Sequence, residues 1–144
     1  MVKILYSFKD DDFFSGKLVI FCSDERFVKA NLEFLKNHLK IERINLMILP
    51  GGPEFIVDIG PDLLERLKIL VNARQTKQII LITHSDCGYY NIKFNDSSKD
   101  EILKIQLNDI HKAIQKLQEI FNGISVCGFH AYMGDPGIIK YTQI

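Results

Sequence analysis

The sequence lacks an excess of charge of either sign, because 18 lysines and arginines balance 18 aspartates and glutamates over 144 residues. Surfaces that bind nucleic acid need a basic excess, so nucleic acid is not an expected partner. No apolar run approaches the roughly 20 residues that cross a bilayer, and no membrane partner is expected either. Near the start, Asp10–Asp12 occupy the place where a signal peptide would need its apolar stretch, which disfavours secretion.

The chain has only three cysteines, Cys22, Cys87 and Cys127, an odd number that cannot all pair with one another. Without an export signal, this count indicates reduced thiols and a cytoplasmic location. Such thiols pack in the core, bind a metal or act as nucleophiles. Other enzyme signatures are missing: the sequence contains no glycine-rich nucleotide loop, no Walker loop and no G-x-S-x-G nucleophile elbow.

Short apolar segments alternate with amphipathic segments along the chain. The apolar segments predict buried strands at Lys17–Cys22, Ile44–Leu49, Gln78–Thr83 and Ile124–Tyr132, followed by a short edge segment at Ile138–Tyr141. The amphipathic segments predict three helices. Their apolar faces contain Val28, Leu32, Leu35 and Leu39; Leu63, Leu64, Leu67, Leu70 and Val71; and Leu103, Leu107, Ile110, Ile114, Leu117 and Phe121. Ser98 and Glu101 fit a capping box at the start of the third helix.

Strands that are apolar on both faces and alternate with helices are typical of a parallel sheet with helices on both sides. We therefore predict a three-layer α/β fold with a mostly parallel sheet of four to five strands in the order 2-1-3-4. Residues 1–144 are expected to form one domain, with residues 1–16 as a short N-terminal arm. In this strand order the chain direction reverses between the first and third strands, and ligands bind beyond the carboxyl ends of the strands there.

Two cysteine motifs fall at those two strand ends. Cys22-Ser-Asp-Glu-Arg follows the first strand, and His84-Ser-Asp-Cys-Gly follows the third. Zinc binds cysteine sulfur and histidine nitrogen in tetrahedral geometry, and catalytic zinc sites keep three protein ligands with a fourth position open. The spacing therefore predicts a zinc site formed by Cys22, His84 and Cys87.

The two motifs, Cys-x-Asp-x-Arg and His-x-x-Cys-Gly, resemble the signature of the β-class carbonic anhydrases. The resemblance implies a zinc enzyme that reversibly hydrates carbon dioxide to bicarbonate by means of a zinc-bound hydroxide. It also implies that Asp24 and Arg26 form a catalytic pair. In that family the aspartate either binds the zinc and closes the site, or pairs with the arginine and leaves room for water, which it then orients.

The resemblance further implies a homodimer or a higher even homo-oligomer. Phe8, Phe13 and Phe14 are apolar residues of the arm that could pack on a partner subunit.

One segment departs from the family pattern. After the second strand the family has an Arg-Asn-Ala-Gly-like stretch, whereas this chain has the predicted loop Pro50–Pro53 followed by Glu54 and Phe55. This departure favours an alternative, a zinc-binding domain without catalysis. Two further alternatives stay open: hydrolysis of carbonyl sulfide or carbon disulfide at the same site, and a cysteine hydrolase with Cys87 as the nucleophile and His84 or Asp24 as its base.

Several of these residues also have plain structural interpretations. Asp24 could cap the following helix, and Arg26 could be a solvated residue of its first turn. Asp86 is as well suited to bond the backbone of its own loop as to take part in chemistry. Cys127 and His130, in the fourth strand, are expected to serve packing.

Overall fold

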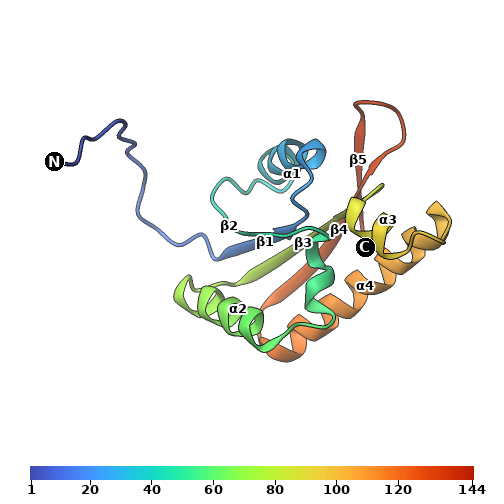
Figure 1. The fold of residues 1–144 in the computed structure, drawn as a ribbon. Helices are drawn as coiled ribbons and strands as arrows, with labels where there is room; N and C mark the ends of the chain where they lie inside the picture. The colour runs from blue at the N-terminus through green and yellow to red at the C-terminus, as the bar shows by residue number, and fades with distance from the viewer.

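A five-stranded sheet forms the middle of the computed structural model, which describes residues 1–144 (Figure 1). Its strands are β1 (Lys17–Phe21), β2 (Asn45–Ile48), β3 (Gln78–His84), β4 (Ser125–Met133) and β5 (Ile139–Gln143). The spatial order is β2-β1-β3-β4-β5, and only β5 is antiparallel to its neighbour. The predicted order and the mostly parallel sheet are confirmed.

The helices cover both faces of this sheet. In Figure 1, α1 (Glu25–Asn37) lies on one side, and α2 (Pro61–Ala73) and α4 (Lys99–Ile120) lie on the other. Alternate residues of β1 reach opposite layers because side-chain direction alternates along a strand. Leu18 and Ile20 belong to the core beneath α2 and α4, whereas Val19 and Phe21 belong to the core beneath α1. The three-layer α/β prediction is therefore confirmed.

Two helical elements were not predicted. A short 3-10 helix, η1 (Gly52–Ile56), begins within the predicted loop Pro50–Pro53 and extends beyond it, and a six-residue helix, α3 (Gly88–Lys93), follows the second cysteine motif. Both are too short to produce a helical pattern of apolar residues, so periodicity could not reveal them.

The capping box at the start of α4 is confirmed by reciprocal bonds. The Glu101 backbone N–H donates to Ser98 Oγ at 3.2 Å, and the Ser98 N–H donates to Glu101 Oε2 at 2.6 Å.

The buried faces of α1 and α4 differ from the predicted faces. Leu32 and Leu103 are exposed, at 41% and 36%, while Asn31 and Gln106 are buried. Each buried amide has a specific partner, which explains why a polar residue occupies a core position. Asn31 accepts a hydrogen bond from the Tyr141 hydroxyl at 2.7 Å, and Gln106 donates to the backbone carbonyl of His84 at 2.9 Å.

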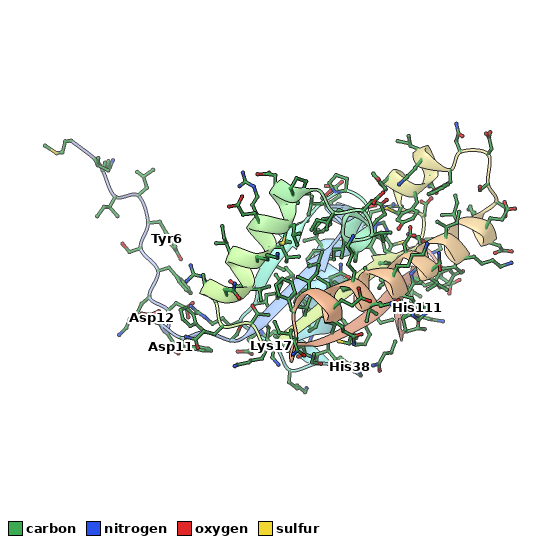
Figure 2. All side chains as sticks on the ribbon, turned by 90° about the horizontal axis from the view of Figure 1, so that it is seen from below. Tyr6, Asp11, Asp12, Lys17, His38 and His111 are labelled. Carbon is green, nitrogen blue, oxygen red and sulfur yellow. The ribbon has the colours of Figure 1, made fainter.

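Residues 1–16 form neither helix nor strand and extend away from the sheet, as Figures 1 and 2 show. The last part of this arm rests on its own subunit. The Arg43 guanidinium lies 4.8 Å from the Phe13 ring centre, and the Arg74 guanidinium lies 5.6 Å from that of Phe14. Phe8 is 77% exposed. None of the helices is both long and apolar enough to cross a membrane.

Close packing between β4 and α4 depends on Gly128. A Cβ atom at this glycine would lie 2.9 Å from Cδ1 of Ile110. We expect Gly128→Val to lower the free energy of unfolding by about 1–3 kcal/mol, because overpacking of a filled core has that cost. Urea denaturation would measure the change.

The double variant Gly128→Val with Ile110→Val removes the methyl group that the new side chain meets. It should therefore be less destabilised than the sum of the two single variants. Strict additivity would contradict the close approach of this helix and strand.

Candidate metal centre

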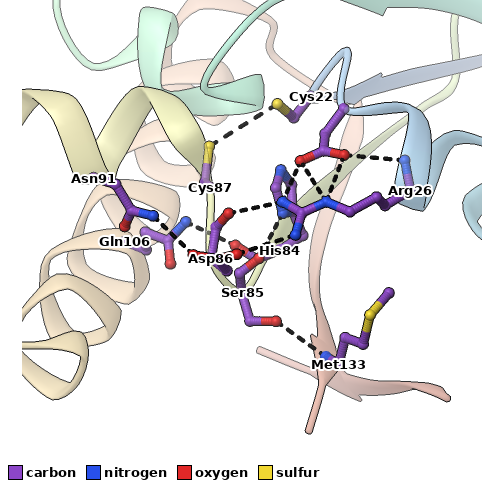
Figure 3. A network of polar contacts seen from close by, with 10 residues as sticks. Cys22, Arg26, His84, Ser85, Asp86, Cys87, Asn91, Gln106 and Met133 are labelled. Atoms are coloured by element: carbon purple, nitrogen blue, oxygen red, sulfur yellow. Dashed lines mark hydrogen bonds and ion pairs between the residues drawn. The ribbon is translucent and has the colours of Figure 1, made fainter. Parts of the chain in front are cut away.

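Three potential metal ligands meet at the carboxyl end of the sheet (Figure 3). Cys22 directly follows β1, His84 is the last residue of β3, and Cys87 caps the start of α3. Because β1 and β3 are neighbouring parallel strands, their ends lie at the same edge. One ligand atom from each residue lies within 4.8 Å of the others, and all three side chains are at least nine-tenths buried. The structure thus brings together the three residues that the sequence analysis predicts as zinc ligands.

The imidazole of His84 is held in one orientation. Its ring stacks on Phe27 with 4.2 Å between ring centres, and Nδ1 lies 2.8 Å from the carbonyl oxygen of Ser85. This bond places the ring proton on Nδ1 and leaves Nε2 with a free lone pair. Nε2 is buried and has no hydrogen-bond partner, which is costly for a polar atom unless another group satisfies it. A metal ion fits this requirement, and the carbonyl of Ser85 is the kind of outer partner that orients ligating histidines.

The two sulfur atoms form a pair, with 4.0 Å between Sγ of Cys22 and Sγ of Cys87. The hydrogen bond from the Cys87 thiol, together with bonds from the backbone N–H groups around it, lowers the pKa of Cys22. The same hydrogen bond to Cys22, together with burial, raises the pKa of Cys87. One thiolate therefore forms readily while the second thiol keeps its proton, which a bound cation would displace.

The burial of Cys87 also bears on the cysteine-hydrolase alternative. A nucleophilic cysteine needs access to substrate, whereas Cys87 is 1% exposed. This burial suits a metal ligand better than a nucleophile.

The loop that departs from the family pattern packs directly against the cluster. A Cβ atom at Gly52 would lie 3.0 Å from the backbone nitrogen of Cys22, and one at Gly51 would lie 2.7 Å from the Tyr89 ring. Both glycines have positive φ angles, 58° and 84°, which side chains rarely adopt. The ion pair between Glu54 and Lys93, at 2.6 Å, fastens η1 to α3. The altered loop thus closes one side of the cluster.

Asp24 both caps α1 and pairs with the Arg26 side chain. One carboxylate oxygen accepts the Arg26 backbone N–H at 3.0 Å, which caps α1. The same carboxylate pairs side-on with the guanidinium, at 3.0 Å from Nε and 2.6 Å from Nη2. These bonds from Arg26 hold the pKa of Asp24 below its usual value, so the carboxylate stays ionised. Arg26 is therefore paired rather than simply solvated.

A second acid holds Arg26 from the opposite side. Nη1 of Arg26 donates to Oδ2 of Asp86 at 3.0 Å, and Nη2 donates to the Asp86 backbone carbonyl at 3.0 Å. Asn91 donates to the other carboxylate oxygen of Asp86 at 2.8 Å. The sequence left both roles of Asp86 open, a bond to its own loop and a part in chemistry, but it did not predict this contact, because nothing in the spacing relates residue 86 to residue 26.

Cys127 and His130 lie outside the cluster. Cys127 is half-buried and accepts a hydrogen bond from Gln78 at 3.8 Å. His130 is buried, and its Nδ1 lies 2.9 Å from the Thr83 hydroxyl. Burial lowers the pKa of His130 to about 4, which keeps the ring neutral. Both residues pack within β4, as expected.

Comparison with known proteins identifies the family. Residues 13–135 match the family described as "Putative carbonic anhydrase". No curated protein sequence matches the chain.

Solved structures of β-carbonic anhydrases share the fold. Isoform I from the protozoan Trichomonas vaginalis is 13% identical, with a TM-score of 0.60, and the match covers 94% of this chain and 86% of that one. One of two tetrameric enzymes from the ascomycete Sordaria macrospora is 16% identical, with a TM-score of 0.59 and coverage of 90% and 81%. The Streptococcus mutans carbonic anhydrase is 15% identical, with a TM-score of 0.59 and coverage of 90% and 82%.

These identities are low and establish the fold alone, whereas the family match spans most of the chain. The chain therefore belongs to the carbonic anhydrase family, as a divergent member with the fold of the β-class enzymes.

Proposed function

We propose that this protein is a zinc-dependent lyase that interconverts carbon dioxide and bicarbonate. The observation that carries the proposal is the buried cluster of Cys22, His84 and Cys87, in which Nε2 of the histidine has no partner within the protein. Membership of the carbonic anhydrase family supports the same reaction.

Cys22, His84 and Cys87 would hold the ion. Two thiolates and a neutral imidazole balance the charge of a divalent cation and are the donors that zinc prefers. A zinc ion held there would supply the nucleophile for carbon dioxide at neutral pH, because zinc in such sites lowers the pKa of water to about 7.

Asp24 and Arg26 would decide whether water or the Asp24 carboxylate occupies the space beside the cluster. Asp24 stays ionised because Arg26 lowers its pKa, so it can accept a hydrogen bond from the attacking water and orient that water. Arg26 binds both carboxylate oxygens of Asp24, which keeps the carboxylate from becoming a metal ligand. The proton released by the reaction passes to solvent, since a carboxylate with a lowered pKa does not retain it.

A second candidate is a zinc-binding domain without catalysis. The observation that favours it is the enclosure of the cluster, where the three ligands are 6%, 2% and 1% exposed. Closed sites are typical of structural zinc. Metal-replete protein that fails to accelerate carbon dioxide hydration above the buffer rate would support this candidate.

We also infer that the chain assembles as a homodimer or a higher even homo-oligomer in the cytoplasm. A reducing compartment keeps Cys22 and Cys87 available as ligands. The apolar residues of the arm that remain exposed on a single chain are Met1, Val2, Ile4, Leu5, Tyr6, Phe8, Phe13 and Phe14. A concentration of exposed apolar residues of this kind is typical of an interface.

Metal content gives the first prediction. The purified protein should contain about one zinc ion per chain, since three soft donors converge at one point. Cys87→Ser should lose most of this zinc, as measured by elemental analysis. Cys127→Ser is the matched control and should keep it, because Cys127 lies outside the cluster. A zinc-free wild type, or full zinc in Cys87→Ser, would contradict the proposed site.

The second prediction concerns the aspartate–arginine pair. Asp24→Ala and Arg26→Ala should each lower carbon dioxide hydration by about 100-fold or more while zinc content stays unchanged. Stopped-flow hydration assays would measure the loss. Arg66→Ala is the control, because Arg66 pairs with Asp62 on an exposed face of α2.

The two variants should differ in anion binding. Asp24→Ala leaves the fourth metal position open and should bind azide, whereas Arg26→Ala frees Asp24 to occupy that position and should exclude azide. A wild-type rate of carbon dioxide hydration in Arg26→Ala, or equal azide binding by both variants, would contradict this role of the pair. Asp24 would then serve only as the cap of α1.

The third prediction concerns assembly. Light scattering should give the mass of a dimer or a higher even oligomer. Replacement of Ile4, Tyr6 and Phe8 by serine should shift the protein toward the monomer, because these exposed apolar residues would then lose their contact area. A monomeric wild type at working concentration would refute the inference.

A further inference from the structure

Arg26 is shared between two acids that come from different parts of the chain. Asp24 binds Nε and Nη2, whereas the carboxylate of Asp86 binds Nη1. The backbone carbonyl of Asp86 accepts a further bond from Nη2. A guanidinium has five N–H donors, so the two acids use different donors of the same group. Asp86 therefore adds bonds to Arg26 without removing those to Asp24.

Asp86 is itself held in place. Its backbone has a φ angle of 53°, the left-handed conformation that aspartate and asparagine tolerate better than most residues. The amide of Asn91, on α3, donates to the carboxylate oxygen that does not face Arg26. The neighbouring Ser85 hydroxyl accepts the backbone N–H of Met133 at 3.0 Å, which ties the same loop to the end of β4. Figure 3 shows this sequence of contacts from Asn91 through Asp86 to Arg26.

We propose that Asp86 is a positioning residue that holds the Arg26 guanidinium in the place where Arg26 binds Asp24. Asp86 and Asn91 thereby favour the open state of the site, in which Asp24 pairs with Arg26 and does not bind the metal. The proposal rests on the proposed function, because the open state matters only if a metal ion occupies the cluster.

Asp86 lowers the entropic cost of ordering the exposed Arg26 side chain. The Arg26 side chain is 44% exposed, and a single ion pair at such a position gains little because the long side chain must be ordered to form it. Asp86 orders the same guanidinium through bonds of its own, so less entropy is lost when Asp24 pairs with it. The negative charge of Asp86 is 58% exposed and therefore screened, which limits its repulsion of Asp24. The gain from ordering the Arg26 side chain therefore exceeds the repulsion between the Asp86 and Asp24 carboxylates. Loss of Asp86 should weaken the ion pair between Arg26 and Asp24.

Azide binding to the cobalt(II)-substituted protein tests the direction of this effect. Visible absorption would follow the titration. Asp86→Gly removes the side chain at a backbone angle that glycine tolerates, and it should weaken azide binding by about two- to five-fold, the range that an exposed ion pair supports. Asn91→Ala leaves the loop backbone intact and should shift azide affinity in the same direction by a smaller factor. Asp86→Asn keeps an acceptor for Arg26 and should restore most of the affinity.

A second readout needs no metal. In the proton–nitrogen correlation spectrum of the metal-free protein, the Arg26 Nε–H signal should exchange with water faster in Asp86→Gly and Asn91→Ala than in the wild type. The Arg66 Nε–H signal serves as the internal control, because its partner Asp62 is unchanged. Asp62→Asn is the matched control variant and should leave both azide affinity and the Arg26 signal unaltered.

The outcomes separate the two proposals. Unchanged azide affinity and an unchanged Arg26 signal in both Asp86→Gly and Asn91→Ala would overturn the positioning role. Tighter azide binding in Asp86→Gly would overturn it as well, since repulsion between the acids would then dominate. A wild type that binds no cobalt or zinc would defeat the proposed function instead, while the Arg26 exchange rates would still decide whether Asp86 orders the guanidinium.

Discussion

The site depends on one constraint, the burial of an imidazole nitrogen that the protein itself does not satisfy. Nε2 of His84 lies beside two sulfur atoms and is shielded from solvent. The surrounding structure maintains this arrangement: Phe27 stacks on the ring, and the Gln106 amide holds the backbone carbonyl of the same residue. A polar atom of this kind is destabilising unless a ligand compensates for it, and the metal ion proposed for this cluster would do so.

The parallel sheet explains why residues far apart in the sequence meet here. β1 and β3 are hydrogen-bonded neighbours, so Cys22 and His84 emerge from the same edge. The α1 helix starts immediately after the first motif, which places Asp24 at its N-terminus and Arg26 in its first turn. Capping and ion pairing therefore reinforce each other at one carboxylate. In the loop that departs from the family pattern, Gly52 lies against the backbone of Cys22 and Gly51 against the ring of Tyr89, at places where a side chain would not fit.

Much of the fold could be predicted from the sequence, because strands buried on both faces are continuously apolar. The proposed metal ligands and the Asp24–Arg26 pair could be predicted because they belong to two short motifs, each of which is local in sequence. Asp86 and Asn91 could not be assigned in the same way, since the contact of Asp86 with Arg26 depends on how the two strand ends are spaced, and Asn91 acts only through its bond to Asp86. The buried amides of Asn31 and Gln106 were missed for a related reason: hydropathy assigns polar residues to the surface, whereas their partners are provided by tertiary structure.

The central claim is that Cys22, His84 and Cys87 together hold one zinc ion. X-ray absorption at the zinc edge of the purified protein tests it most directly, because scattering distinguishes sulfur from lighter ligands. The account predicts two sulfur atoms at about 2.3 Å and a histidine nitrogen at about 2.0 Å from the metal. A zinc environment of nitrogen and oxygen alone, with no sulfur neighbours, would contradict it.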